Sequence, residues 1–400
     1  FWLCPWLHHK ELQRTFCPNL SLSSNLRAMA VTDSTVEPEA KKARKGPAKL
    51  GFGIVGCGMG SETHAWCFKR MEEVDFVAVY GRSAEKAEAF KDKWGARRAY
   101  SNFEEFCADP EIHVVVICVP NGLHRDFAVP AAKAGKHLVV EKPLDTTLEK
   151  GLEIAHACSE NKVVLTGIYQ MRFCEATRRI EEAIKAGRLG ALIHCDVQDK
   201  EFRDASYYGD ADNHWWAGQR ELGGGGCLTT QSSHVLDLMH TFMGDVKSVF
   251  AKARTAFHKI EVEDICSAII TFSSGATATV NSMTCIQPAF KHRIEVHGTK
   301  GTVMMNGEYD KITFWQVEGE EKIDEIGTFG ITDIVDPHLF PMDRHIANLR
   351  DAILAVQSQG QRAPLLDAEA FLKSELLRFS IYESAATGRE VELDYSKIKL

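Results

Sequence analysis

The stretch from residue 49 to 170 alternates apolar segments with helix-like segments, and this alternation limits the possible folds more than any other feature. Helix-like segments with caps separate five apolar segments that are typical of buried strands, at residues 49–56, 74–81, 112–120, 136–143 and 162–170. Parallel strands joined by helices of about a dozen residues form a doubly wound sheet. The sequence therefore predicts an α/β domain with such a sheet over about residues 48–170.

Glycines follow the first predicted strand and begin the helix after it. Ligands of a doubly wound sheet bind at the carboxyl ends of its strands. Gly56 permits a tight turn, Gly58 lets the backbone approach a pyrophosphate, and Gly60 stands one residue before Ser61, which occupies the place of a third glycine. With Met59, these residues are the predicted phosphate cradle of a Rossmann-type dinucleotide site. A flexible turn is the alternative interpretation.

The end of the second predicted strand bears on the choice of cofactor. An NAD site usually has a carboxylate about 20 residues past the glycines. Here the strand ends in Tyr80, Gly81, Arg82 and Ser83. Arg82 and Ser83 suit a 2′-phosphate, so we expect NADP, with NAD as the alternative. Ser83 could also serve only as the N-cap of the next helix.

The second half of the chain predicts a different architecture. Alternating apolar residues separated by glycine-containing turns indicate hairpins of a mostly antiparallel sheet. Helical stretches follow at residues 343–360 and 369–388. We expect an α+β domain over residues 171–400, which would bind substrate and mediate oligomerisation.

In order and spacing, a set of short motifs resembles the Gfo/Idh/MocA oxidoreductases, a family named for glucose-fructose oxidoreductase and inositol dehydrogenase. The motifs lie between residue 49 and the end of the chain: GFGIVGCGMG, CVPNGLH, EKP, YQMRF, RLGAL, GGGGCLTTQSSHVLDL, VHGTKGTV and YESAATGREVEL. The resemblance implies hydride transfer between a nicotinamide and a secondary alcohol of a sugar, cyclitol or trans-dihydrodiol. It also implies an open sheet face that packs against a partner subunit in a dimer or tetramer.

The resemblance assigns the central chemistry to Lys142, the lysine of EKP. In the family this lysine lies beside the nicotinamide and holds the substrate oxygen. A free lysine is a poor base at neutral pH, but partial burial and a positive cofactor ring would lower its pKa. Glu141 would hold the cofactor or orient the lysine.

His234 is the second catalytic candidate, and Asp237 lies on the same predicted helix face. The family pattern has an aspartate four residues before the histidine, where this chain has Thr230. A hydroxyl can orient a histidine or donate to substrate, but it carries no charge. The alternative is a structural histidine satisfied by Asp237.

Further site candidates are less specific. On the cofactor side they are Pro120, Asn121, His124 and Gln170, and on the substrate side Arg172, Tyr208, Trp216 and Arg220. Aromatic residues before the glycine run 223–226 could form a wall for a sugar, or they could belong to a packed loop.

Composition sets limits on partners and location. The net charge of −8 gives no general affinity for nucleic acid. We also expect no membrane span, because no apolar run reaches 18 residues, and no metal site, because no His or Cys cluster has ligand spacing. The 12 scattered cysteines fit a reducing compartment, so we expect a cytoplasmic protein.

Residues 1–47 are predicted to be a disordered extension. The first methionine is Met29, so residues 1–28 could be upstream-translated sequence or a targeting segment, and residues 41–45 could be a nuclear signal. Two rival functions remain open: a non-catalytic NAD(P)-binding regulator, and an NAD-dependent glycosidase of the same family.

Overall fold

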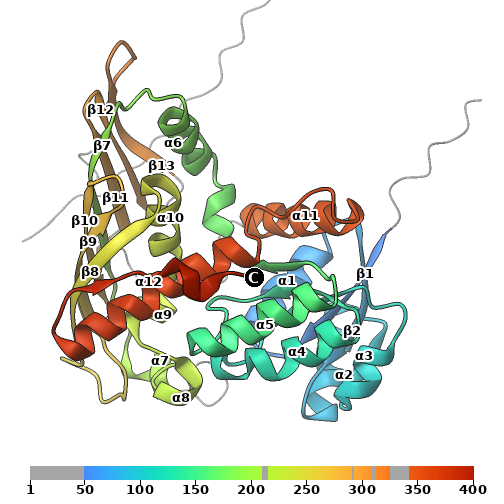
Figure 1. Ribbon diagram of the computed structural model, residues 1–400. Helices are drawn as coiled ribbons and strands as arrows, with labels where there is room; N and C mark the ends of the chain where they lie inside the picture. Colours follow the sequence, from blue (N-terminus) through green and yellow to red (C-terminus); the bar gives the residue numbers. More distant parts are fainter. Residues whose placement is uncertain (1–48, 210–214, 291, 308–310, 325–341) are drawn as a thin grey trace, which may run out of the picture. The chain divides into compact units, whose positions relative to one another are not determined.

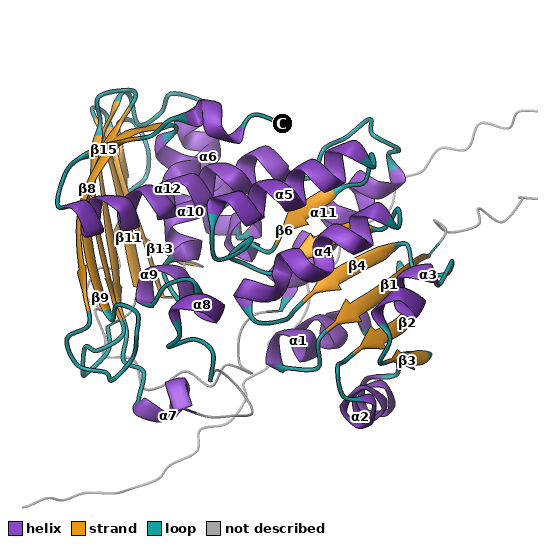
Figure 2. Ribbon diagram, turned by 60° about the horizontal axis from the view of Figure 1, so that its bottom comes forward, coloured by secondary structure: helices purple, strands orange, loops and turns teal. Residues whose placement is uncertain are grey.

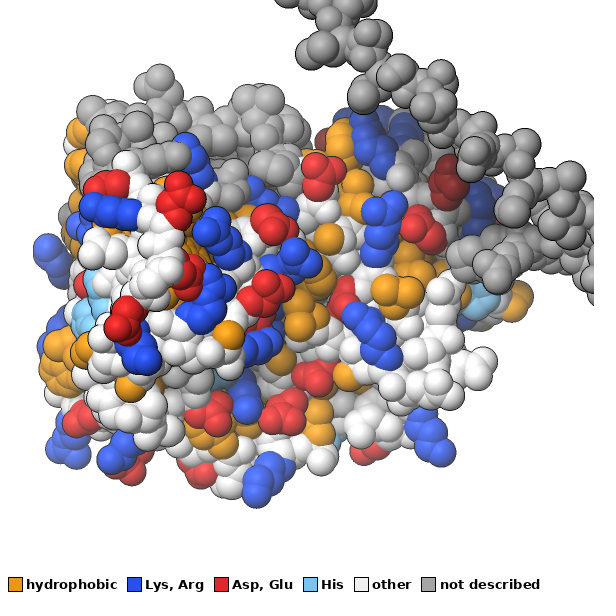
Figure 3. All heavy atoms as spheres, turned by 90° about the horizontal axis from the view of Figure 1, so that it is seen from above, with side chains coloured by type: hydrophobic (Ala, Val, Ile, Leu, Met, Phe, Trp, Pro, Cys, Tyr) orange, Lys and Arg blue, Asp and Glu red, His pale blue; other side chains and the backbone are white. Residues whose placement is uncertain are grey.

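The computed structural model describes residues 49–209, 215–290, 292–307, 311–324 and 342–400 (Figure 1). The predictions for residues 1–47 lie outside this part of the chain. All ten cysteines within it are free. None of the described helices is long and apolar enough to cross a membrane. On the face drawn in Figure 3, acidic and basic side chains are interspersed, and neither sign dominates the described surface.

The first sheet has six parallel strands in the order β3-β2-β1-β4-β5-β6. The strands are β1 (Leu50–Val55), β2 (Val74–Tyr80), β3 (Arg98–Tyr100), β4 (Val114–Ile117), β5 (His137–Val140) and β6 (Leu165–Gly167). This order reverses direction between β1 and β4, where a doubly wound sheet binds its ligand. The predicted Rossmann-type domain is thus confirmed, with β3 as a short edge strand that the sequence analysis did not identify.

Helices cover both faces of this sheet (Figure 2). They are α1 (Met59–Phe68), α2 (Ala84–Trp94), α3 (Phe103–Ala108), α4 (His124–Lys133) and α5 (Leu148–Glu160), with a 3-10 turn η1 (Asn121–Leu123) before α4. Residues of α3, α4 and α5 contribute to the apolar core on one face, and residues of α1 and α2 to the core on the other. The strands between them are nearly all buried, as expected of a parallel sheet.

The second sheet is mostly antiparallel and has the order β14-β13-β12-β11-β7-β10-β9-β8-β15. Its strands are β7 (Leu192–Lys200), β8 (Val246–Arg254), β9 (Ile265–Phe272), β10 (Thr277–Met283), β11 (His292–Gly298), β12 (Gly301–Gly307), β13 (Lys311–Val317), β14 (Ile323–Asp324) and β15 (Val391–Glu392). The pair β7 and β10 is parallel and the other pairs are antiparallel. The predicted α+β architecture is confirmed.

The remaining helices lie along or between the two sheets. They are η2 (Gln170–Phe173), α6 (Glu175–Lys185), α7 (Ala205–Gly209), α8 (Arg220–Gly223), α9 (Cys227–Thr230), α10 (Ser233–Met243), α11 (Asp343–Gln357), α12 (Ala368–Thr387) and η5 (Tyr395–Ile398). The outer face of the second sheet exposes Ile193, Phe250 and Ile269. A partner subunit on this face remains a prediction.

Helix α12 joins the two cores, as Figures 1 and 2 both show. Its Phe371 and Leu372 pack with the first sheet, whereas Leu377 and Ile381 pack with the second. Helix α11 adds Leu349 to the core of the first sheet, on the face covered by α1. Helices from the end of the chain therefore contribute to the apolar cores on the faces of the first sheet. The domain boundary at residue 170 remains a prediction.

Candidate active site

The turn after β1 leads into helix α1, whose N-terminus has no side-chain cap. Gly56 adopts a φ of 115°, and a Cβ there would lie 2.2 Å from the carbonyl oxygen of Cys118, so only glycine fits. Helix α1 begins at Met59 with Gly58 as its N-cap, and no side chain caps it. A Cβ on Gly58 would meet nothing within 4 Å. The first N–H groups of α1 are therefore available to a phosphate, as a dinucleotide cofactor requires.

The rest of this turn lies against β4. Ser61 is fully buried, and a Cβ on Gly60 would lie 4.0 Å from the Cβ of Cys118. The end of β2 places Arg82 and Ser83 at the surface. The Ser83 hydroxyl accepts a hydrogen bond of 3.3 Å from the backbone N–H of Lys86, so Ser83 caps α2. Arg82 stands beside it with no carboxylate at this strand end.

The loop after β4 mainly supports neighbouring backbone. Asn121 is buried, and its side-chain amide donates to the carbonyl oxygen of Gly223 at 2.8 Å. His124 is fully buried, and its ring lies 2.9 Å from the carbonyl oxygen of Pro143 and 3.0 Å from that of Val119. Pro120 immediately precedes η1. These contacts hold the loops that carry Lys142 and the glycine run, which gives His124 a structural task.

Glu141 and Lys142 follow β5, and a cis peptide joins Lys142 to Pro143. Helix α1 holds the side chain of Glu141: its carboxylate lies 2.8 Å from Nε2 of His64, a fully buried histidine of that helix. Burial opposes the charge of Glu141, but His64, His345 and Lys142 together outweigh this effect, and the pKa of Glu141 is lowered. Glu141 is therefore an oriented carboxylate beside the lysine.

Lys142 connects the two sheets at this point. Its Nζ donates a 2.7 Å hydrogen bond to the carbonyl oxygen of Thr230, at the end of α9. Burial lowers the pKa of Lys142, and the negative charges of Glu141, Glu201 and Asp199 oppose that shift. A partly exposed lysine with a lowered pKa can exchange a proton closer to neutral pH than a free lysine.

His234 stands on the first turn of α10, and its ring meets that of Tyr169 edge-on at 5.8 Å between centroids. Nδ1 of His234 has no hydrogen-bond partner within the described residues. Burial and the nearby Lys142 hold the pKa of His234 well below its usual value, so the ring is neutral at physiological pH. A neutral imidazole can accept a proton.

Asp237 does not pair with His234. Its two carboxylate oxygens each accept a 2.7 Å hydrogen bond from the guanidinium of Arg172, and Ser374 donates a third at 2.8 Å. Arg172 and Asp237 are 9% and 1% exposed. The two residues were predicted as substrate and catalytic groups, and the structure joins them in a buried ion pair between η2 and α10. Gln170 is also buried, with its side-chain oxygen unpartnered among the described residues.

The predicted aromatic wall is partly structural. The hydroxyl of Tyr208 pairs with that of Thr284 at 2.9 Å in a buried contact. Arg220 donates to the carbonyl oxygen of Glu261 at 2.7 Å, and Trp216 is partly exposed. The backbone N–H and the guanidinium of Arg220 both donate to Glu261, so these bonds hold Arg220 in the loop rather than at Lys142.

A run of glycines precedes α9 because another segment passes very close to it. A Cβ on Gly226 would lie 1.7 Å from the carbonyl oxygen of Glu263. The buried carboxylate of Glu263 accepts from the backbone N–H groups of Gly226 and Leu228, and from the hydroxyl of Tyr382. Burial raises the pKa of Glu263. Glu263 thereby fixes the turn that leads to Thr230 and His234.

Three polar residues near Lys142 were not identified from the sequence. Asp199 and Glu201 lie at the end of β7, and His292 of β11 bridges them, with Nδ1 3.2 Å from Asp199 and Nε2 2.7 Å from Glu201. The signal was the alternation of β7: Cys195, Val197 and Asp199 share its buried face. We call Asp199, Glu201 and His292 the β7–β11 cluster.

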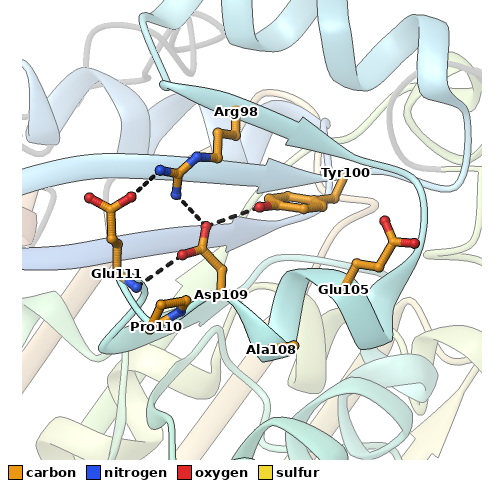
Figure 4. A pocket seen from close by; sticks show the side chains of 7 residues that line it. All are labelled: Arg98, Tyr100, Glu105, Ala108, Asp109, Pro110 and Glu111. Carbon is orange, nitrogen blue, oxygen red and sulfur yellow. Dashed lines mark hydrogen bonds and ion pairs between the residues drawn. The ribbon is translucent and has the colours of Figure 1, made fainter.

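A depression on the first sheet lies away from these residues, at β3 and α3 (Figure 4). Arg98 forms ion pairs with Asp109 and Glu111, and the hydroxyl of Tyr100 donates to Asp109 at 3.0 Å. Arg98, Asp109 and Glu111 thus neutralise one another at this depression.

Comparison with known families gives two matches along the chain. Residues 50–169 match an oxidoreductase family with an NAD-binding Rossmann fold. Residues 177–304 match the GFO/IDH/MocA C-terminal domain. Together the two matches cover more than half of the chain.

Individual relatives match over most of their length. A 1,5-anhydro-D-fructose reductase from Ensifer adhaerens is 27% identical over 330 residues, 80% of this chain and 91% of the relative. A D-xylose 1-dehydrogenase (NADP(+)) from Haloferax volcanii is 26% identical over 349 residues, 86% of this chain and 99% of the relative. The structure of the WlbA dehydrogenase from Bordetella pertussis, in complex with NADH and UDP-GlcNAcA, is similar with a TM-score of 0.76 and 29% identity, covering 86% and 99% of the two chains. The chain belongs to the Gfo/Idh/MocA family of oxidoreductases.

Proposed function

We propose that this protein interconverts a secondary alcohol and a carbonyl on a sugar, cyclitol or trans-dihydrodiol, with NADP as its preferred cofactor. The main supporting observation is Lys142: it stands at the carboxyl end of β5, and its Nζ reaches the carbonyl oxygen of Thr230 at 2.7 Å. The names of the relatives agree with this substrate class, since they include a reductase of an anhydro-sugar and a dehydrogenase of xylose.

Two residues of the chain would carry the proton and the charge. The ammonium of Lys142 would donate to the substrate oxygen, where negative charge develops in the transition state. The neutral imidazole of His234, a partly exposed side chain, would take the hydroxyl proton in the oxidative direction and return it in the reductive one. A bound nicotinamide would supply the hydride acceptor or donor.

Replacing Lys142 with methionine tests this assignment. Methionine is unbranched like lysine, one atom shorter and uncharged, so cofactor affinity should stay nearly unchanged, while kcat should fall by about 10³-fold or more. Lys133→Met, an exposed position at the end of α4, is the matched control and should retain full activity. The readouts are fluorescence titration of the reduced cofactor and absorbance assays against aldoses, inositols and dihydrodiols. Undiminished turnover of Lys142→Met would remove Lys142 from the chemistry.

The cofactor preference rests on Arg82. It is exposed at the end of β2, where NAD-specific sites usually have a carboxylate. A 2′-phosphate held by a guanidinium contributes about 1.5–3 kcal/mol, so Arg82→Ala should weaken NADPH binding by roughly 10-fold or more. Binding of NADH should not change. Tighter binding of NADH than of NADPH by the unaltered protein would contradict the preference.

A non-catalytic NAD(P)-binding regulator is the second candidate, because Thr230 stands where the family pattern has a carboxylate. The same measurements separate the two functions. Cofactor binding without turnover of any alcohol or carbonyl in the panel would favour the regulator.

A further inference from the structure

Thr230 cannot stand in for the carboxylate that the family pattern has at this position. Its hydroxyl donates a 2.8 Å hydrogen bond to the carbonyl oxygen of Gly226, one turn back in α9. Its only link to Lys142 is through its backbone carbonyl. The side chain at position 230 therefore brings no negative charge to the lysine.

Besides the adjacent Glu141, two carboxylates from the second sheet act on Lys142. Asp199 and Glu201 are 1% and 7% exposed. After Glu141, these two residues raise the pKa of Lys142 against the effect of burial. His292 lies between the two carboxylates and holds their relative position. Two buried acids at the end of β7, a strand remote from Lys142 in the chain, thus act on the charge of the lysine.

The turn between α9 and α10 connects the lysine to this cluster through three consecutive residues. The carbonyl oxygen of Thr230 accepts from Lys142. The side-chain oxygen of Gln231 accepts a 3.2 Å hydrogen bond from Arg203, whose guanidinium also pairs with Glu201. The hydroxyl of Ser232 donates to Asp199.

We propose that Asp199 and Glu201, bridged by His292, are positioning residues that supply Lys142 with the carboxylate charge absent at position 230. This inference rests on the proposed function for its catalytic consequence. The titratable and charged groups that act on Lys142 or on which it acts are Glu141, Asp199, Glu201, Arg203, His234 and His345.

The same three cluster residues have the spacing of a metal-ligand set. Arg203 pairs with Glu201, His292 lies between both carboxylates, and the hydroxyl of Ser232 bonds to Asp199. Groups of the protein therefore already balance and hold these acids.

The pKa of the Lys142 amino group can be measured directly by competitive acetylation followed by mass spectrometry over a pH series. Asp199→Asn and Glu201→Gln keep the shape and remove one charge each, so each should lower this pKa by about one unit. Asp196→Asn is the matched control, because Asp196 lies on the opposite face of β7 and is partly exposed. An unchanged pKa in both cluster variants, or an equal shift in the control, would overturn the proposal.

Thr230→Asp tests the same idea without disturbing the cluster. A carboxylate introduced at position 230 should raise the pKa of Lys142 in the otherwise unaltered protein. When combined with Asp199→Asn, it should raise both the pKa of Lys142 and kcat part of the way back to their values in the unaltered protein. A merely structural role for Asp199 would not be rescued from α9, so absence of any rescue would count against the proposal.

Activity measurements separate this inference from the proposed function. If the function is right, Asp199→Asn should lower kcat with little change in cofactor affinity, and the limb of the pH–rate profile that belongs to Lys142 should move to lower pH. If the unaltered protein turns over no substrate in the panel, the proposed function fails. The acetylation series would still decide whether the cluster sets the charge of Lys142.

Discussion

Replacing Asp237 with asparagine tests whether this residue stabilises the fold or takes part in the chemistry. The family pattern places this aspartate with the catalytic histidine, whereas the structure pairs it with Arg172 through two hydrogen bonds of 2.7 Å. Both partners are at least nine-tenths buried. Asparagine keeps the size and one acceptor oxygen, but it leaves the guanidinium without a counter-charge. We therefore expect a loss of fold stability rather than a specific loss of chemistry.

The magnitude follows from the burial of the pair. Breaking a buried ion pair from one side costs about 3–5 kcal/mol, and the retained acceptor places Asp237→Asn near ~3 kcal/mol. Unfolding entropy is roughly 0.7 kcal/mol per kelvin for about 350 residues, so Tm should fall by about 4 °C. The exposed pair of Arg178 and Glu175 on α6 is the control, and Glu175→Gln should cost less than about 0.5 kcal/mol.

A double-mutant cycle completes the test by calorimetry and denaturant unfolding. Arg172→Met combined with Asp237→Leu replaces the ion pair with apolar groups and should recover most of the stability lost in either single variant. The reasoning is refuted if Asp237→Asn keeps the Tm of the unaltered protein while its pH–rate profile changes. Asp237 would then act in the chemistry, as the sequence analysis expected.

Two further predictions concern the backbone and pH. Gly58→Ala should leave Tm unchanged, because a Cβ there meets nothing within 4 Å, but it should weaken cofactor binding. Gly226→Ala should fail to fold or lose several kcal/mol of stability, because its Cβ would lie 1.7 Å from the carbonyl oxygen of Glu263. Burial lowers the pKa of His345 to about 4, so its contribution to stability is present above pH 6.5 and is lost as the pH falls toward 4. His345→Asn should therefore reduce the loss of unfolding free energy between pH 6 and 5 by about 1 kcal/mol, measured by denaturant titration at both pH values.

The first sheet could be predicted because each of its main strands and helices has a sequence pattern of its own. Each buried strand and each capped helix between residues 49 and 170 shows its own periodicity, so the alternation alone gives the fold class. Strand β3 and helix α3 were missed because they span three and six residues, too few for a period to emerge. Helix α11 was predicted as a helix, but its place against the first sheet depends on contacts far apart in the chain.

The candidate site was predicted in part for the same reason. Gly56, Gly58 and Lys142 follow strands, and their positions follow from the rule that ligands bind at strand ends. The partner of Asp237 could not be predicted, because helical spacing pointed to His234 and the actual partner, Arg172, is 65 residues away. The alternation in β7 indicated a buried face but not that Lys142 lies near it.

Buried carboxylates in and around the segment from Gly226 to Asp237 have different partners, which give them different tasks. Glu263 accepts backbone N–H groups and fixes the turn, and Asp237 neutralises Arg172 and anchors α10. Asp199 is bound by a hydroxyl and a histidine, neither of which is a fixed cation, and its pKa is raised by burial to about 6. Its negative charge raises the pKa of Lys142, as do those of Glu141 and Glu201. Position 230 can carry a threonine because the charge that a carboxylate would have supplied there is already delivered from the adjoining strand.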